Sequence, residues 1–152
     1  MKKLKVTLDT NVIVSGIILE RGIPYSILEL WRRGAFLLIT SNELIAEVVE
    51  VFHRAKTVKN YIIPVEKLSA IVKLLKQKSR VVIPAPFTQA IPLRDKKDIF
   101  ILETAIIGKA ECLVTGDKDL ISLRSQSEIK PLVIITPQQF LELLRGTAET
   151  RF

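Results

Sequence analysis

Short apolar runs alternate with amphipathic segments along this chain of 152 residues, and the alternation restricts the fold more than any other feature. Apolar runs of about four to eight residues are typical of buried strands, whereas apolar positions that recur every three or four residues indicate helices. Strands that alternate with helices predict βαβ crossovers and a parallel sheet with helices on both faces. We therefore expect an α/β fold, a single three-layer α/β/α domain with a mainly parallel, roughly five-stranded sheet.

The expected strands cover residues 4–8, 36–39, 80–83, 112–115 and 132–135. The expected helices cover residues 24–33, 41–55, 64–78, 95–107 and 137–144. Either Thr40 or Ser41 caps the second of these helices, and Gly34 and Gly108 mark two helix ends. Residues 84–92 contain three prolines and form an irregular connection. We assign residues 1–145 to the domain and expect a frayed tail over residues 146–152.

The composition limits the possible classes of protein. A hydrophobic content of 48% is ample for a packed core and slightly rich for a monomer, so we expect a homodimer. The apolar stretches fall short of the roughly 20 residues of a membrane span, and the start of the chain lacks the pattern of a signal peptide. The single cysteine, Cys112, suits a reducing cytoplasm. The net charge of +7 agrees either with solubility or with attraction to nucleic acid.

Acidic residues follow two of the expected strands. Asp9 comes directly after the first strand, and Asp117 follows the fourth. In an open α/β sheet, ligands bind at the carboxyl ends of the strands, where the strand order reverses, so the two aspartates could share a site. Two carboxylates about 4 Å apart repel by about 4 kcal/mol at an effective dielectric of 20, and a proton or a cation relieves this. The pair points to a divalent metal.

Each acid also has a simpler structural interpretation. Asp9 could cap a following helix, and Asp117 could belong to a turn. Asp95 and Asp98 could complement the positive end of a helix dipole. Three further acids share one helix face, and spacing alone does not choose among them: Glu43, Glu47 and Glu50.

The motifs become specific in combination. In chain order they are Leu8-Asp9-Thr10-Asn11-Val12, Ser41-Asn42-Glu43-Leu44 with Glu47, Asp95-x-x-Asp98 with Ala105, Leu113-Val114-Thr115-Gly116-Asp117, and Thr136-Pro137 with Phe140-Leu141. Together they resemble the PIN-domain (PilT N-terminus) ribonuclease family over residues 6–144. Within that family the chain most resembles the subgroup of toxin components of toxin–antitoxin pairs, whose closing pattern is the last motif.

The resemblance implies a catalytic and metal-binding site of four acids: Asp9, Glu47, Asp98 and Asp117. It selects Glu47 from the three glutamates of the helix face. It implies four supporting residues, namely Asn11, Thr115, Asp95 and Asp119. The chain departs from the family at Lys96-Lys97, where relatives often carry proline and a further acid. The basic residues next to the site in sequence are candidate RNA phosphate contacts: Arg94, Lys96, Lys97 and Lys118.

Carboxylate ligands without histidine or cysteine suit Mg²⁺ or Mn²⁺, as one or two ions. Such ions activate water and neutralise charge on a leaving oxygen. With the resemblance, this implies a cytoplasmic metal-dependent endoribonuclease, with RNA as substrate and a cognate antitoxin as partner. The alternative is a catalytically silent PIN fold that binds RNA or protein. A receiver-like Mg²⁺ module is disfavoured, because Pro84-Ala85-Pro86 follows the third strand in place of a phosphoacceptor aspartate.

Overall fold

The computed structural model describes residues 3–58, 63–86 and 96–149 of the chain. Its strands are β1 (Lys5–Leu8), β2 (Leu37–Ser41), β3 (Arg80–Val82), β4 (Cys112–Val114) and β5 (Val133–Ile135). Its helices are α1 (Thr10–Ile18), α2 (Ile23–Arg32), α3 (Asn42–Val58), α4 (Val65–Lys78), α5 (Lys96–Ile107), α6 (Lys118–Ile121) and α7 (Pro137–Glu149), with a 3₁₀ turn at Ser127–Ile129. Every strand and helix expected from the sequence is present. Three elements were not among those expected: α1, α6 and the 3₁₀ turn.

The strands form one parallel sheet in the order β3-β2-β1-β4-β5. Val6 of β1 pairs with Leu38 of β2 on one side and with Cys112 of β4 on the other. The chain builds outward from β1 to β3 and then returns to place β4 beside β1. The strand order therefore reverses between β1 and β4, and the carboxyl ends of these two strands form the switch point.

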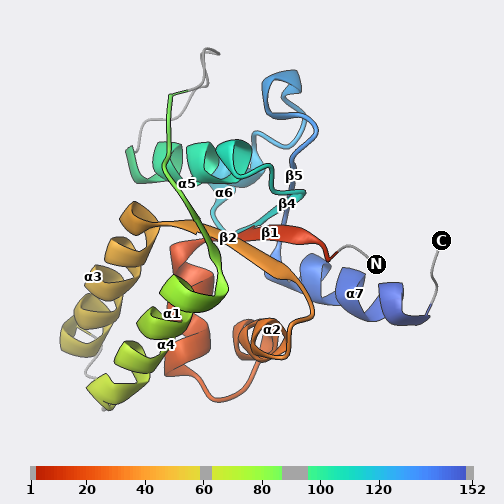
Figure 1. Cartoon of the computed structure of the whole chain (residues 1–152). Coiled ribbons are helices and arrows are strands. Elements are labelled where there is room, and N and C mark those ends of the chain that lie inside the picture. The colour runs from red at the N-terminus through yellow and green to blue at the C-terminus, as the bar shows by residue number, and fades with distance from the viewer. Residues whose placement is uncertain (1–2, 59–62, 87–95, 150–152) are drawn as a thin grey trace.

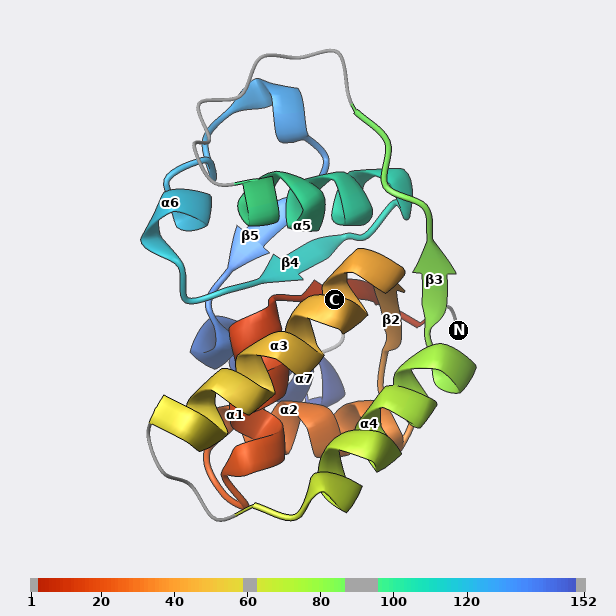
Figure 2. The same ribbon diagram turned by 90° about the vertical axis from the view of Figure 1, so that its left-hand side faces the viewer.

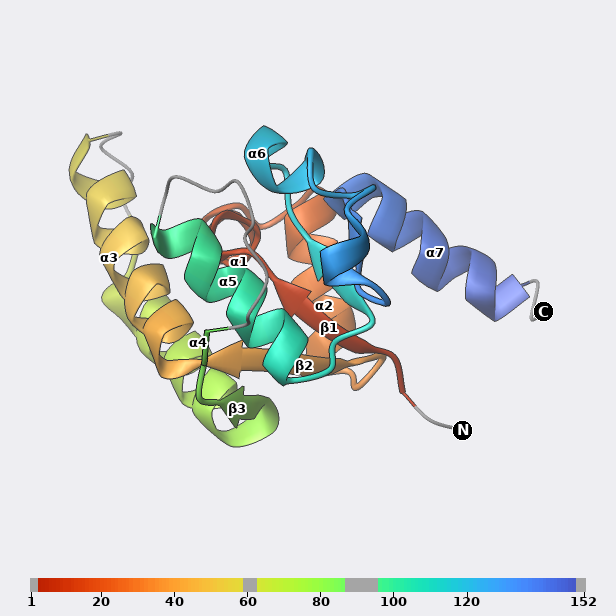
Figure 3. The ribbon, with the colours of Figure 1, turned by 90° about the horizontal axis from the view of Figure 1, so that it is seen from above.

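Helices cover both faces of the sheet, which confirms the three-layer α/β/α architecture. Helix α5 lies on one face, whereas α1, α2, α4 and α7 lie on the other (Figure 1). Seen from above, α5 lies over the sheet with α3 on one side and α7 on the other (Figure 3). Gly108 permits the close approach of α5 to β2, because a Cβ at this position would lie 2.1 Å from Ile39 Cγ2. On the opposite face, Phe36 and Phe140 pack edge to face with ring centroids 5.1 Å apart.

The predicted helix signals at Gly34 and Ser41 are realised. Gly34 takes a φ of +84° after α2, and the following Ala35 N–H donates to Leu30 O at 2.9 Å, as in a Schellman motif. Ser41 caps α3, because its Oγ accepts the Leu44 N–H at 3.2 Å. Helix α3 then continues to Val58, three residues beyond the expected end.

The last helix is longer than expected. Thr136 and Gln139 exchange hydrogen bonds at its start: Gln139 N–H donates to Thr136 Oγ1 at 3.1 Å, and Thr136 N–H donates to Gln139 Oε1 at 3.0 Å. The helix continues to Glu149. The expected helix end at residue 144 is therefore wrong, and the fraying expected over residues 146–152 stays a prediction. A glycine within a helix costs only about 1 kcal/mol, and Gly146 does not stop this one. Residues 150–152 lie outside the described part of the chain.

Within the described ranges, no single helix is long and apolar enough to cross a membrane. Helices α1 and α2 reach the required length and composition only as a pair, and they are bent by 94° relative to each other.

Candidate metal centre

The first and fourth strands deliver their aspartates to the switch point of the sheet. Asp9 follows β1 directly, and its backbone N–H donates to Val114 O of β4 at 2.9 Å. Asp117 follows β4 by three residues and begins α6 as its N-cap. The pairing of β1 with β4 thus brings together two acids that are far apart in the sequence.

Thr115 connects the two aspartates. Its side chain is fully buried, and its Oγ1 donates to Asp9 Oδ2 at 2.6 Å. The same oxygen accepts the backbone N–H of Asp117 at 3.0 Å. A hydroxyl group has one proton to donate and lone pairs to accept, so both bonds can form together. Thr115 therefore holds the Asp9 carboxylate and the Asp117 backbone in one arrangement.

The Asp9 side chain is not a helix cap. Asp9 occupies the N-cap position of α1, but its carboxylate makes no capping hydrogen bond, so the capping interpretation is wrong. Burial raises the pKa of this carboxyl above its ordinary value, and the negative charges of Asp117 and Glu47 raise it further. Hydrogen bonds from Thr115 and the Thr10 backbone offset this rise only in part. Asp117 and Glu47 are therefore close enough to Asp9 to repel it.

A cluster of three carboxylates lies between α5 and α6. One carboxylate oxygen from each of Asp98, Asp117 and Asp119 lies within 4.8 Å of the other two. Figure 2 shows α6 beside the amino end of α5, from which Asp98 comes. Ligand oxygens on opposite sides of Mg²⁺ are about 4.2 Å apart, given bonds of about 2.1 Å. The 4.8 Å limit on the spacing is close to this value, and the hard oxygen donors suit Mg²⁺ or Mn²⁺. No other such group occurs among the described residues.

The three acids of this cluster differ in exposure. Asp98 is buried, Asp117 is half-buried and Asp119 is exposed. Asp117 Oδ1 accepts the backbone N–H of Asp119 at 2.8 Å, so Asp117 also closes the turn that leads into α6. The turn and the metal-ligand interpretations of Asp117 are therefore compatible. The short helix α6 brings Asp119 into the cluster, although the sequence suggested it only as a supporting residue.

The other predicted site residues occupy different places. Glu47 is half-buried on α3, and Asn11 is exposed on α1. Lys97 Nζ lies 3.9 Å from Glu50 Oε1, so this ammonium group is paired with an acid on α3. Lys118 is exposed at the first position of α6. Two predicted residues, Arg94 and Asp95, lie outside the described residues, as does the side chain of Lys96.

One buried acid was missed by sequence reasoning. Glu103 on α5 is 7% exposed, and burial, followed by the charge of Glu43, raises the pKa of its carboxyl. The available signal was an acid within the apolar run Ile101-Leu102-Glu103-Thr104-Ala105. Glu103 does not belong to the cluster of three carboxylates.

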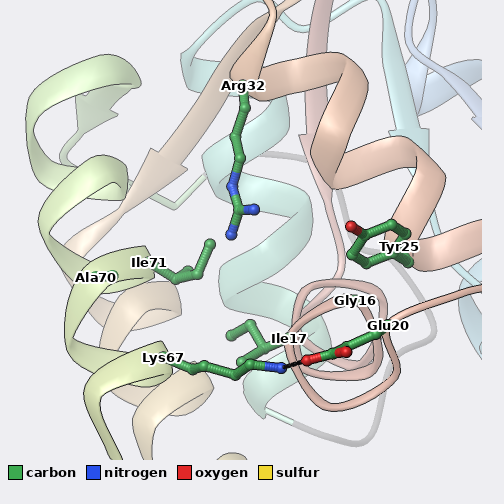
Figure 4. A pocket seen from close by; sticks show the side chains of 8 residues that line it. All are labelled: Gly16, Ile17, Glu20, Tyr25, Arg32, Lys67, Ala70 and Ile71. Atoms are coloured by element: carbon green, nitrogen blue, oxygen red, sulfur yellow. Dashed lines mark hydrogen bonds and ion pairs between the residues drawn. The ribbon is translucent and has the colours of Figure 1, made fainter.

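A separate cavity of about 230 Å³ lies between α1, α2 and α4 (Figure 4). Its lining residues are Gly16, Ile17, Glu20, Tyr25, Arg32, Lys67, Ala70 and Ile71. Lys67 Nζ forms an ion pair with Glu20 there. None of the predicted catalytic acids lines this cavity, so it is distinct from the carboxylate cluster.

These features define an α/β domain with a carboxylate centre at the switch point of a parallel sheet. Comparison with known families agrees, since residues 5–119 match the PIN domain. The chain belongs to the PIN domain family, whose members are generally nucleases and typically use divalent metals. It is also similar to the uncharacterized protein MJ1680 of Methanocaldococcus jannaschii, with 34% identity over 146 residues that cover 92% of this chain and 91% of that protein.

Proposed function

We propose that this protein is a divalent-metal-dependent endoribonuclease that hydrolyses phosphodiester bonds of RNA. The observation that carries the proposal is the convergence of Asp98, Asp117 and Asp119 within 4.8 Å beside the buried Asp9. So many carboxylates in one place repel one another, and a divalent cation offsets this repulsion.

The acids have distinct roles in the proposal. Asp9 and Asp117 bind the metal directly, and Glu47 and Asp98 complete the site, directly or through water. Asp119, Asn11 and Asp95 are supporting residues in the proposal, and Thr115 orients Asp9. One or two Mg²⁺ or Mn²⁺ ions would activate the attacking water and neutralise charge on the leaving oxygen. Because the Thr115 hydroxyl donates to Asp9 Oδ2, the Asp9 carboxylate presents a constant orientation to its ligand.

Cleavage of an unstructured RNA with Mn²⁺ and with EDTA tests the proposal. The parent protein should cleave only with Mn²⁺, and Asp9→Asn should lose cleavage while keeping the fold. Glu128→Gln is the matched control, because Glu128 is an exposed acid outside the cluster. Equal survival of RNA with Mn²⁺ and with EDTA would favour the catalytically silent scaffold. Asp9→Asn cleaving as fast as the parent would refute the assigned site.

We further propose that the protein is the toxin of a toxin–antitoxin pair and acts in the cytoplasm. The support is the sequence resemblance, including Thr136-Pro137 followed by Phe140-Leu141. Induced expression should then arrest growth, whereas expression of Asp9→Asn should not. Co-expression of the adjacent reading frame should restore growth if that frame encodes the antitoxin.

We also propose that the protein forms a homodimer. Apolar side chains are exposed at both edges of the sheet, with Ile83 beside β3 84% exposed and Val133 on β5 49% exposed. Burying such side chains between two copies would be favourable. Light scattering should give about twice the chain mass of 17.1 kDa. A mass of one chain at micromolar concentration would contradict the dimer.

A further inference from the structure

Four exposed basic residues lie where β2 and β3 begin, at the amino edge of the sheet: Lys3, Arg33, Lys78 and Arg80. We call this group the basic edge. The carboxylate cluster lies at the carboxyl edge of the same sheet. The two groups are thus separated along the strand direction.

The four residues of the basic edge lie near one another, either through a contact or because they are neighbours in the sequence. Lys78 Nζ, at the end of α4, donates to Arg32 O at the end of α2 at 2.6 Å. Arg33 is the next residue after that carbonyl. A Cβ placed on Gly34 would lie 3.1 Å from Lys3 Nζ, so Lys3 reaches the same turn. Arg80 begins β3 two residues after Lys78 and pairs with Ile39 of β2.

The charges of the basic edge are not neutralised within the described part of the chain. None of its four residues forms an ion pair there, whereas the neighbouring Arg32 pairs with Glu29 at 2.5 Å. Helix dipoles favour cations at helix ends, and this accounts for Arg33 and Lys78. Lys3 and Arg80 lie outside any helix, so the dipoles do not explain them. Helix dipoles therefore explain the positive charge of the basic edge only in part.

We propose that the basic edge binds backbone phosphates of the RNA substrate, several nucleotides away from the bond that is cleaved. The inference rests on the proposed function. The carboxylates of the metal centre repel RNA, so binding free energy must come from another part of the surface. Cations that neutralise phosphates release counterions, which favours binding of any sequence. The five residues of β2 span about 16 Å, so Lys3 and Arg33 lie roughly that far from the carboxyl ends of the strands. Arg80 pairs with Ile39, two residues before the end of β2, and lies about 7 Å from those ends.

RNA binding in EDTA tests the inference separately from cleavage. The test variant is Arg33→Gln/Lys78→Gln/Arg80→Gln, measured with a fluorescent single-stranded RNA by anisotropy over a range of salt concentrations. The control is Arg21→Gln/Lys130→Gln/Arg145→Gln, which removes three exposed cations elsewhere and the same total charge. Circular dichroism establishes that each variant is folded.

Each phosphate contact contributes about 0.7 to the slope of log K against log salt for a single strand. Loss of three contacts should therefore reduce that slope by about 2 and weaken binding about a hundredfold at roughly 0.1 M salt. The control should keep most of the parent's slope. Binding by the test variant that equals the parent's, or an equal loss in the control, would overturn the inference.

Two further outcomes separate this inference from the proposed function. If the parent binds RNA through the basic edge in EDTA but does not cleave it with Mn²⁺, the nuclease fails and the basic edge stands. If the test variant binds RNA normally but no longer binds phosphatidylglycerol vesicles that the parent binds, the surface recognises lipid and the inference is overturned.

Discussion

The substitution Asp9→Asn should have opposite effects on stability with and without metal. Asparagine keeps the shape of the side chain, and its amide oxygen can still accept the hydrogen bond that Thr115 donates at 2.6 Å. It removes a charge that burial disfavours and that Asp117 and Glu47 repel. The pKa of Asp9 is raised in the fold despite its hydrogen bonds, so in the metal-free protein the neutral side chain is the less costly one.

The sign of the pH dependence follows from this raised pKa. The folded protein binds the Asp9 proton more tightly than the unfolded chain, in which this carboxyl has its ordinary pKa of 3.8. The parent therefore loses stability as pH rises from the unfolded pKa through the higher folded pKa. Asp9→Asn does not titrate there. The extra stability of Asp9→Asn over the parent should be absent below the pKa that Asp9 has in the unfolded chain. It should be complete above the pKa that Asp9 has in the folded protein.

The magnitudes make the two effects measurable by thermal unfolding. One pKa unit corresponds to about 1.4 kcal/mol, and about 1 kcal/mol shifts the Tm of a domain of this size by about 2–4 °C. We expect Asp9→Asn to melt above the parent in EDTA, because burial and the neighbouring charges raise the pKa of Asp9. A metal at about 100 times its Kd stabilises the parent by about 2.7 kcal/mol, or roughly 5–10 °C, and this gain should be lost in the variant.

Melting curves at neutral pH in EDTA and in Mn²⁺ provide the assay, with Glu128→Gln as the matched charge control. The control should follow the parent in both conditions. The reasoning is refuted if Asp9→Asn melts below the parent in EDTA, because the Asp9 carboxylate would then stabilise the metal-free fold. If Mn²⁺ raises the Tm of Asp9→Asn as much as it raises that of the parent, Asp9 is not a metal ligand.

Three further predictions concern neighbouring features. Thr115→Val leaves Asp9 Oδ2 and the Asp117 N–H without the partner they share. Urea denaturation should show that the free energy of unfolding falls by about 1–3 kcal/mol, and the affinity for Mn²⁺ should also fall. Thr115→Ser should restore both quantities. Gly108→Ala places a Cβ 2.1 Å from Ile39 Cγ2 and should lower the free energy of unfolding by about 1–3 kcal/mol. Gly146→Ala has open space around its Cβ and should raise the free energy of unfolding by up to about 1 kcal/mol. Equal effects of the two substitutions in urea denaturation would contradict the packing of α5 against β2. Burial, followed by the charge of Glu111, raises the pKa of Cys112 to about 11. A thiol reagent at mildly alkaline pH should therefore label Cys112 slowly in the native protein and quickly after denaturation. Fast labelling of the native protein would contradict the burial of Cys112.

Local patterns in the sequence determined the elements and several of their ends. Strand and helix periodicities are encoded within short windows, so each expected strand and helix was recovered. Gly34, Ser41 and Thr136 act through backbone groups a few residues away, and their cap signals were correct. The same patterns placed Asp9 and Asp117 after strands. The far ends of α3 and α7 were underestimated, because neither helix has a strong stop signal where the apolar pattern weakens.

The tertiary structure alone decided which acids meet. The pairing of β1 with β4 joins segments that are more than a hundred residues apart, as the 106-residue separation of Asp9 and Thr115 shows. No local pattern encodes that pairing, because it depends on packing between the sheet and both helical layers. Helix α6 has four residues, too few to show a period, so the place of Asp119 in the cluster was not predictable. The ion pair of Lys97 with Glu50 joins two different helices, so only packing brings these residues together.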